Sequence, residues 1–114
     1  MATLYTRTFA FKDSLSDEQV LKEWQFALEE VGPAVLKVSG VRSVKFYSGA
    51  GALRADLSAL IEMEDASVYE RVLLDADVRK LLGRMYGNWD LTTAGQSFRR
   101  EVTAELIQAL SSTR

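Results

Sequence analysis

The sequence has neither cysteine nor histidine among its 114 residues. Without cysteine the chain cannot form disulfide bonds, thiolate metal sites or a thiol nucleophile. Without histidine it lacks the commonest general base, the commonest zinc ligand and the usual axial ligand of haem. We therefore expect no metal site and no cofactor, and a carboxylate is the candidate for any general base.

Long apolar runs and an excess of charge are also missing. No stretch approaches the roughly 18 consecutive apolar residues of a membrane-spanning helix, and Met1–Phe11 lacks the basic and apolar segments of a secretory signal. The net charge is only −2, which offers no general attraction to nucleic acid or anionic lipid. The composition, 47% hydrophobic and 26% charged, is typical of one globular domain over residues 1–114. We expect a cytoplasmic protein with no membrane or nucleic-acid partner.

Alternating apolar and polar residues predict four β-strands, over Thr3–Phe11, Val41–Ser48, Ala52–Met63 and Thr92–Arg100. The alternation is clearest in the third strand. Its apolar face carries Leu53, Ala55, Leu57, Ala59, Ile61 and Met63. Its other face is mostly polar and carries Arg54, Asp56, Ser58, Leu60 and Glu62. The short segment Gly49-Ala50-Gly51 indicates a hairpin turn between the second and third strands.

Apolar residues at helical spacing predict two longer helices between these strands. The first begins at a capping box formed by Ser16 and Gln19, and Gly32-Pro33 should end or bend it. The second begins near Ser67, and Asp75-Ala76-Asp77 could break it into two pieces.

The second helix should end at Gly87-Asn88, and a short helix over Val102–Leu110 completes the chain. The order of elements is then β-α-β-β-α-β plus a terminal helix. Right-handed crossovers place both longer helices on one face of a four-stranded antiparallel sheet, with the first and third strands in its centre. The predicted fold class is α+β, a ferredoxin-like sandwich.

It has to be decided which face of the first strand lies beneath the helices, because Arg7 lies in the middle of this strand. An arginine beneath two helices would be a costly buried charge. We therefore expect the face with Tyr5, Arg7, Phe9 and Phe11 to lie opposite the helices, together with Arg54, Asp56, Ser58 and Glu62 of the third strand. Exposed rings would form a large apolar patch on a small monomer. A second copy packed against the same face would bury them and leave the charged groups lining a cavity between the sheets.

Three segments carry a resemblance to a known group of proteins. They are Val-Ser-Gly-Val-Arg-Ser-Val (Val38–Val44), Asp-Ala-Ser-Val-Tyr-Glu (Asp65–Glu70) and Leu-Asp-Ala-Asp-Val-Arg (Leu74–Arg79). With these segments the chain resembles the dimeric α/β-barrel superfamily, in particular its antibiotic-biosynthesis-monooxygenase and stress-responsive members. The resemblance implies a homodimer whose two sheets close face to face. No catalytic residue can be assigned from the resemblance, because the histidines that some family members use as acid or base have no counterpart in this sequence.

Three kinds of function fit these observations. The first is a homodimeric barrel that binds a small aromatic or anionic organic molecule in a cavity lined by the open sheet face. The second, implied by the resemblance, is a cofactor-independent monooxygenase or polyketide-cyclase-like enzyme. The third is a structural or regulatory dimer without a ligand. The candidate ligand-binding residues are Tyr5, Arg7, Phe9, Arg54, Ser58 and Trp89. Asp56 is the candidate catalytic base, and loss of turnover in Asp56→Asn with binding intact would separate an enzyme from a binder.

Each candidate also has a structural interpretation. Arg7 with Asp56 or Glu62 fits a structural ion pair better than a ligand site. Trp89, in the aromatic segment 84–90, is more typical of a loop anchor than of a stacking platform. An RNA-recognition domain shares the same order of elements, but it needs surface aromatic residues on its reading strand, and Arg54–Glu62 has none.

Overall fold

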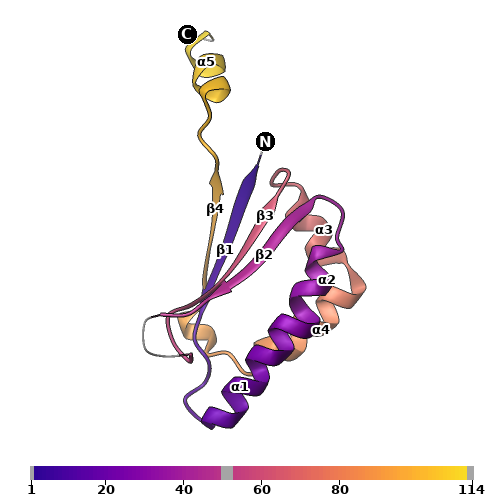
Figure 1. The fold of residues 1–114 in the computed structure, drawn as a ribbon, viewed down its shortest axis with the longest axis vertical. Coiled ribbons are helices and arrows are strands. Elements are labelled where there is room, and N and C mark those ends of the chain that lie inside the picture. The colour runs from indigo at the N-terminus through magenta and orange to yellow at the C-terminus, as the bar shows by residue number, and fades with distance from the viewer. Residues whose placement is uncertain (1, 50–52, 113–114) are drawn as a thin grey trace.

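The computed structural model describes residues 2–49 and 53–112 and is drawn in Figure 1. The strands are β1 (Thr3–Phe9), β2 (Val41–Tyr47), β3 (Leu57–Met63) and β4 (Gly95–Arg100). The helices are α1 (Asp17–Phe26), η1 (Ala27–Val31), α2 (Gly32–Leu36), α3 (Val68–Leu74), α4 (Ala76–Tyr86), η2 (Leu91–Thr93) and α5 (Ala104–Ser112). No helix in this described part of the chain is both long and apolar enough to cross a bilayer.

The four strands form one antiparallel sheet in the order β2-β3-β1-β4. Helices α1 to α4 cover one face of this sheet, and the other face carries no helix in Figure 1. The predicted ferredoxin-like topology is therefore confirmed, with β1 and β3 as the central pair.

Local sequence signals fix most of the helix ends. The Ser16–Gln19 capping box forms, and the Asp75 side chain accepts a hydrogen bond from the Val78 backbone N–H at 3.0 Å, which separates α3 from α4. Of the two outcomes expected at Gly32-Pro33, an end or a bend, the helix does not end. The chain passes through the π-helical turn η1 and continues as α2, where the Gly32 backbone N–H donates to the Ala27 carbonyl and Pro33 occupies the first turn.

The expected faces of β1 are reversed in the structure. Arg7 pairs with Ala59, so Tyr5, Arg7 and Phe9 share the helix-covered face with the apolar side of β3. Tyr5 is 5% exposed and Phe9 only 3%, and Phe11 beyond the strand is equally buried. The sequence-based placement of these residues on the open face is wrong, because burying three rings outweighs the cost of one guanidinium that finds partners.

The third strand is shorter than predicted. Residues 53–56 lie outside the sheet, where the Arg54 side chain donates hydrogen bonds to the Leu15 carbonyl at 3.0 Å and to the Asp17 carboxylate at 2.7 Å. Asp56 has a positive φ of 54° and is exposed. The predicted hairpin turn at residues 49–51 falls largely outside the described residues. Strand β4 also begins later than expected, after the 3₁₀ turn η2.

The open face of the sheet carries short hydroxyl residues, charged residues and two leucines. Register places on it Leu4, Thr6, Thr8, Ser43, Lys45, Tyr47, Ser58, Leu60, Glu62, Ser97 and Arg99. Leu4 and Leu60 lie on its two central strands. This face therefore lacks the aromatic patch that the sequence pattern predicted.

Gly40 provides a sharp test of the fold. Its φ of 95° is one that L-residues rarely adopt, and an added Cβ would lie 2.5 Å from a Val68 methyl group. We expect Gly40→Ala to lower the free energy of unfolding by about 2 kcal/mol. The matched variant Gly83→Ala, in α4 with open space around it, should raise it by about 0.5–1 kcal/mol. Urea unfolding measures both, and equal effects at the two glycines would contradict this account.

Candidate functional site

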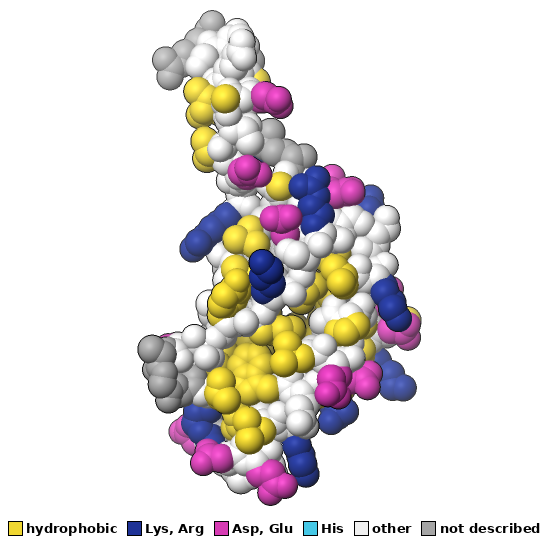
Figure 2. Space-filling view, in the orientation of Figure 1, with side chains coloured by type: hydrophobic (Ala, Val, Ile, Leu, Met, Phe, Trp, Pro, Cys, Tyr) yellow, Lys and Arg dark blue, Asp and Glu magenta, His cyan; other side chains and the backbone are white. Residues whose placement is uncertain are grey.

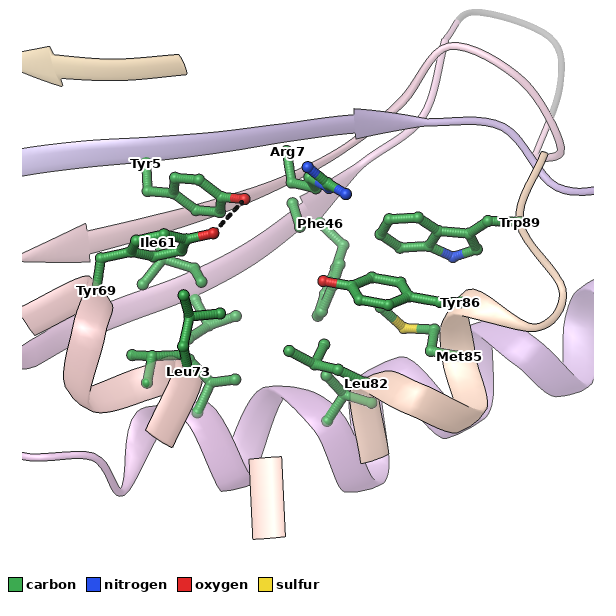
Figure 3. A pocket seen from close by; sticks show the side chains of 15 residues that line it. Tyr5, Arg7, Phe46, Ile61, Tyr69, Leu73, Leu82, Met85, Tyr86 and Trp89 are labelled. Atoms are coloured by element: carbon green, nitrogen blue, oxygen red, sulfur yellow. Dashed lines mark hydrogen bonds between the residues drawn. The ribbon is translucent and has the colours of Figure 1, made fainter. Parts of the chain in front are cut away.

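A cavity lies between the sheet and the helices, and Figure 3 shows the side chains that line it. The space open to water-sized molecules is about 40 Å³. Most of the lining is apolar and consists of Val31, Val35, Val44, Phe46, Ala59, Ile61, Val72, Leu73, Leu82 and Met85. The remaining lining residues are Tyr5, Arg7, Tyr69, Tyr86 and Trp89. The cavity therefore combines an apolar wall with a few polar groups, as small-molecule sites do.

Arg7 supplies the positive charge of this cavity. Its Nη1 donates a hydrogen bond to the Gln96 side-chain oxygen at 3.2 Å, and its guanidinium lies 5.7 Å from the Tyr86 ring and 5.9 Å from the Trp89 ring. Its Nε is buried and has no hydrogen-bond partner among the described residues. Arg7 also forms no ion pair within this part of the chain. An unused buried donor on a half-buried cation is a feature that an anionic ligand oxygen would satisfy.

Two tyrosine hydroxyls lie near the guanidinium at one end of the cavity. Tyr69 donates to the Tyr5 hydroxyl at 3.4 Å, the bond drawn in Figure 3, and Tyr5 donates to Gln96 at 3.1 Å. Burial, with the hydrogen bond from Tyr69, raises the pKa of the Tyr5 hydroxyl well above its usual value. Burial also raises the pKa of Tyr86, against the opposing effect of Arg7. Tyr5 and Tyr86 therefore stay protonated; the Tyr5 hydroxyl donates to Gln96, and the Tyr86 hydroxyl is a neutral O–H group in the cavity lining.

Trp89 forms the other end of the cavity. It is 1% exposed, stacks on Phe9 at a ring separation of 3.8 Å, and makes an edge contact with Tyr86. The preceding residue, Asn88, donates to the buried Glu23 carboxylate at 2.7 Å, which fixes the segment that follows α4. Trp89 thus combines the predicted anchoring role with a place in the cavity wall.

The structure brings together only part of the predicted site. Tyr5, Arg7 and Trp89 line the cavity, and Phe9 lies behind Trp89 without lining it. Arg54 is bound to the start of α1, Asp56 is exposed, and Ser58 lies on the open face. The catalytic role of Asp56 stays a prediction, and no contact with the cavity supports it. The ion pair predicted between Arg7 and Asp56 or Glu62 does not form.

Sequence reasoning missed three polar residues of the site: Tyr69, Tyr86 and Gln96. Tyr69 follows the helical apolar pattern of the second predicted helix, so a core position explained it fully. Tyr86 belongs to the aromatic segment that the sequence does single out. Gln96 has no sequence signal, because its role depends on the pairing of β4 with β1.

The described residues contain no cluster of three or more histidine, cysteine or carboxylate side chains that could hold a metal ion.

Val44 and Phe46 of β2 contribute to two separate hollows. They line the inner cavity and also a surface groove on the outer side of the same strand.

No protein-family model and no curated protein matches the sequence, whereas solved structures match its fold. One is a dimeric protein of unknown function with a ferredoxin-like fold from Bacteroides fragilis, at 10% identity and a TM-score of 0.73, covering 88% of this chain and 96% of that one. Another is SnoaB, a cofactor-independent oxygenase from Streptomyces nogalater, at 7% identity and a TM-score of 0.71, covering 90% of this chain and 95% of that one.

A third match is an antibiotic biosynthesis monooxygenase, at 10% identity and a TM-score of 0.67, covering 90% of this chain and all of that one. The chain has the fold of dimeric ferredoxin-like proteins and antibiotic biosynthesis monooxygenases. The resemblance seen in the sequence is thus confirmed for the fold. At such identities the likeness extends to the backbone alone, so the function has to be argued from the cavity.

The raised pKa of Tyr5 predicts a loss of stability in alkali. The folded chain keeps this proton while an unfolded tyrosine releases it, so the free energy of unfolding should fall as pH rises above about 10, by up to about 1.4 kcal/mol per pH unit. Tyr86 contributes in the same direction. Tyr5→Phe should flatten this slope in urea unfolding, and Tyr47→Phe is the matched loss of an exposed hydroxyl. An unchanged slope in Tyr5→Phe would contradict the burial argument.

Proposed function

We propose that the protein binds a small aromatic molecule with an anionic or phenolic oxygen in the cavity between the sheet and the helices. The buried, unpartnered Nε of Arg7 carries this proposal. The guanidinium and the protonated Tyr86 hydroxyl would hold the oxygen, and the apolar lining would hold the rings. The face of Trp89 adds a flat surface at one end.

Binding of a ring requires the cavity to widen, because about 40 Å³ holds a few waters at most. The side chains that close it toward α3 and α4 are the least buried of the lining. Leu73 is 42% exposed, and Tyr69, Leu82 and Tyr86 are half-buried. We place the entrance between these two helices, where rotation of long side chains opens the site without breaking the sheet.

We also propose that the protein is a homodimer that packs through its open sheet faces. Support comes from the neighbours described as dimeric and from the sheet face that no helix covers. Leu4 and Leu60 lie at the centre of this face, where Glu62 and Arg99 flank Leu4, and Lys45 and Thr6 flank Leu60. The ligand would then bind inside each protomer, on the other side of the sheet from the contact.

The binding proposal predicts a charge-dependent loss in Arg7→Met. With 2-naphthoate as the probe, calorimetric titration should show affinity falling ten- to a hundredfold, because a charged hydrogen bond of about 1.5–3 kcal/mol is lost. The neutral counterpart 2-acetylnaphthalene should bind both proteins alike. Arg7→Lys keeps the charge but not the planar fork, so it should bind with intermediate affinity.

Arg42→Met, at an exposed position of β2, is the control and should leave both affinities unchanged. Urea unfolding of each variant shows that the fold is kept. If 2-naphthoate and 2-acetylnaphthalene lose affinity equally in Arg7→Met, the proposed anion contact is absent.

A second candidate function is cofactor-independent oxygenation, which the fold shared with SnoaB favours. A hydroxyaromatic held as its anion by Arg7 in a cavity with little water is electron-rich and can itself reduce dioxygen. The overall step converts one ring C–H of a phenol to a carbonyl, consumes one O₂ and releases one water. The substrate supplies the electrons, and the protein supplies position and charge.

An oxygen electrode with 1-naphthol tests this second function. The wild-type protein should consume one O₂ per naphthoquinone formed, and Arg7→Met should lose most of this rate. If 1-naphthol binds without protein-dependent oxygen uptake, the oxygenase candidate fails for this substrate class while the binding proposal stands.

A further inference from the structure

The C-terminal helix α5 stands apart from the rest of the molecule. Figure 1 shows it beyond the end of the sheet, joined to β4 by an extended segment. The chain accordingly measures 56 × 31 × 21 Å, and its radius of gyration is 16.1 Å, against about 13 Å for a compact domain of this length. Within the described residues, α5 makes no substantial contact with another helix or strand.

This arm, residues 101–112, carries apolar side chains that the protomer leaves in water. Val102 is 72% exposed and Ile107 53% exposed. Leu106 is buried, yet it lies outside the core cluster, so the arm adds nothing to the core. A helix of nine residues is marginal in water when alone, and packing of its apolar side is what normally stabilises it.

A groove of about 510 Å³ lies on the surface beside strand β2. Leu28, Pro33 and Leu36 line it from the helices, and Lys45, Phe46 and Tyr47 line it from the strand. Leu28 is 61% exposed and Leu36 50% exposed. Figure 2 shows apolar side chains gathered between β2 and the helices, and others along the arm. The molecule thus has an apolar groove and a helix with exposed apolar side chains.

We propose that α5 of one copy packs into the β2-side groove of a second copy, and the reverse. The groove adjoins the open face, because Lys45 and Tyr47 belong to both, so a copy seated on that face lies next to the groove. The charges are complementary, since the only charged residue of α5 is the acidic Glu105 and the groove carries the basic Lys45.

The arm points away from its own groove. Strand β4 forms one edge of the sheet and β2 the other, and three strand spacings separate them by about 14 Å. The residues that link β4 to α5, 101–103, bridge at most about 14 Å between Arg100 and Ala104, so the arm would have to turn back and lie straight across the sheet to reach that groove. Figure 1 also shows the arm leading away from the sheet. A second copy of this chain is therefore the occupant that the geometry favours.

Because the sequence contains no cysteine, disulfide cross-linking between introduced cysteines can test this packing without competing thiols. A chain with Leu36→Cys is mixed with a chain that carries Ile107→Cys, and the mixture is oxidised after subunits have exchanged. The packed arm should give a disulfide-linked product at twice the 12.7 kDa mass of the chain on a non-reducing gel. Leu28→Cys offers a second groove position if one pair is misaligned.

The control pair is Ile107→Cys with Leu74→Cys, an exposed position of α3 outside the groove, and should give only a trace of product. Two outcomes overturn the proposal. One is the absence of cross-linking from both groove positions in a protein that sediments as a dimer. The other is an internal disulfide at monomer mass in the double variant Leu36→Cys/Ile107→Cys. The arm packing rests on the proposed homodimer, so a protein that sediments as a monomer overturns both proposals. Neither readout involves a ligand, so the proposed ligand binding is tested separately.

Discussion

The pairing of Arg7 with Ala59 is the constraint on which the rest of the structure depends. It places a guanidinium beneath the helices and next to a side chain that is only a methyl group. Such burial is costly unless donors find partners, and Gln96 and two aromatic faces supply part of them. A slip of one residue would move Arg7 to the open face, but it would expose Tyr5 and Phe9 as well. The rings that stabilise the core therefore hold the charge in the cavity.

Much of this architecture follows from local signals, and the part that does not depends on pairing across the sheet. The capping box at Ser16 and the acidic break at Asp75 can be predicted from a few neighbouring residues, and so can the strand order. The face of β1 could not, because the sequence argument weighed the desolvation of Arg7 alone. It did not include the oxygen that Gln96 brings from β4, some ninety residues away. The contribution of Gln96 to the polar end of the cavity could not be predicted for the same reason, because it depends on the pairing of β4 with β1.

The fold by itself says little about chemistry, since similar backbones carry an oxygenase and proteins of unknown function. The cavity of this chain is lined by one cation, tyrosine side chains and otherwise apolar residues. Such a site suits an aromatic ligand whose negative charge is spread over an oxygen and a ring. It differs from the carboxylate chemistry that the sequence suggested for Asp56, which lies in an exposed turn.

Val44 and Phe46 line the inner cavity on one side and the surface groove on the other. Under the two proposals above, a molecule that widens the cavity and a helix seated in the groove would press on these two side chains from opposite sides. By thermodynamic linkage, each would then alter the affinity of the other by the same factor. Ligand binding and subunit association would thus be coupled through the same two residues.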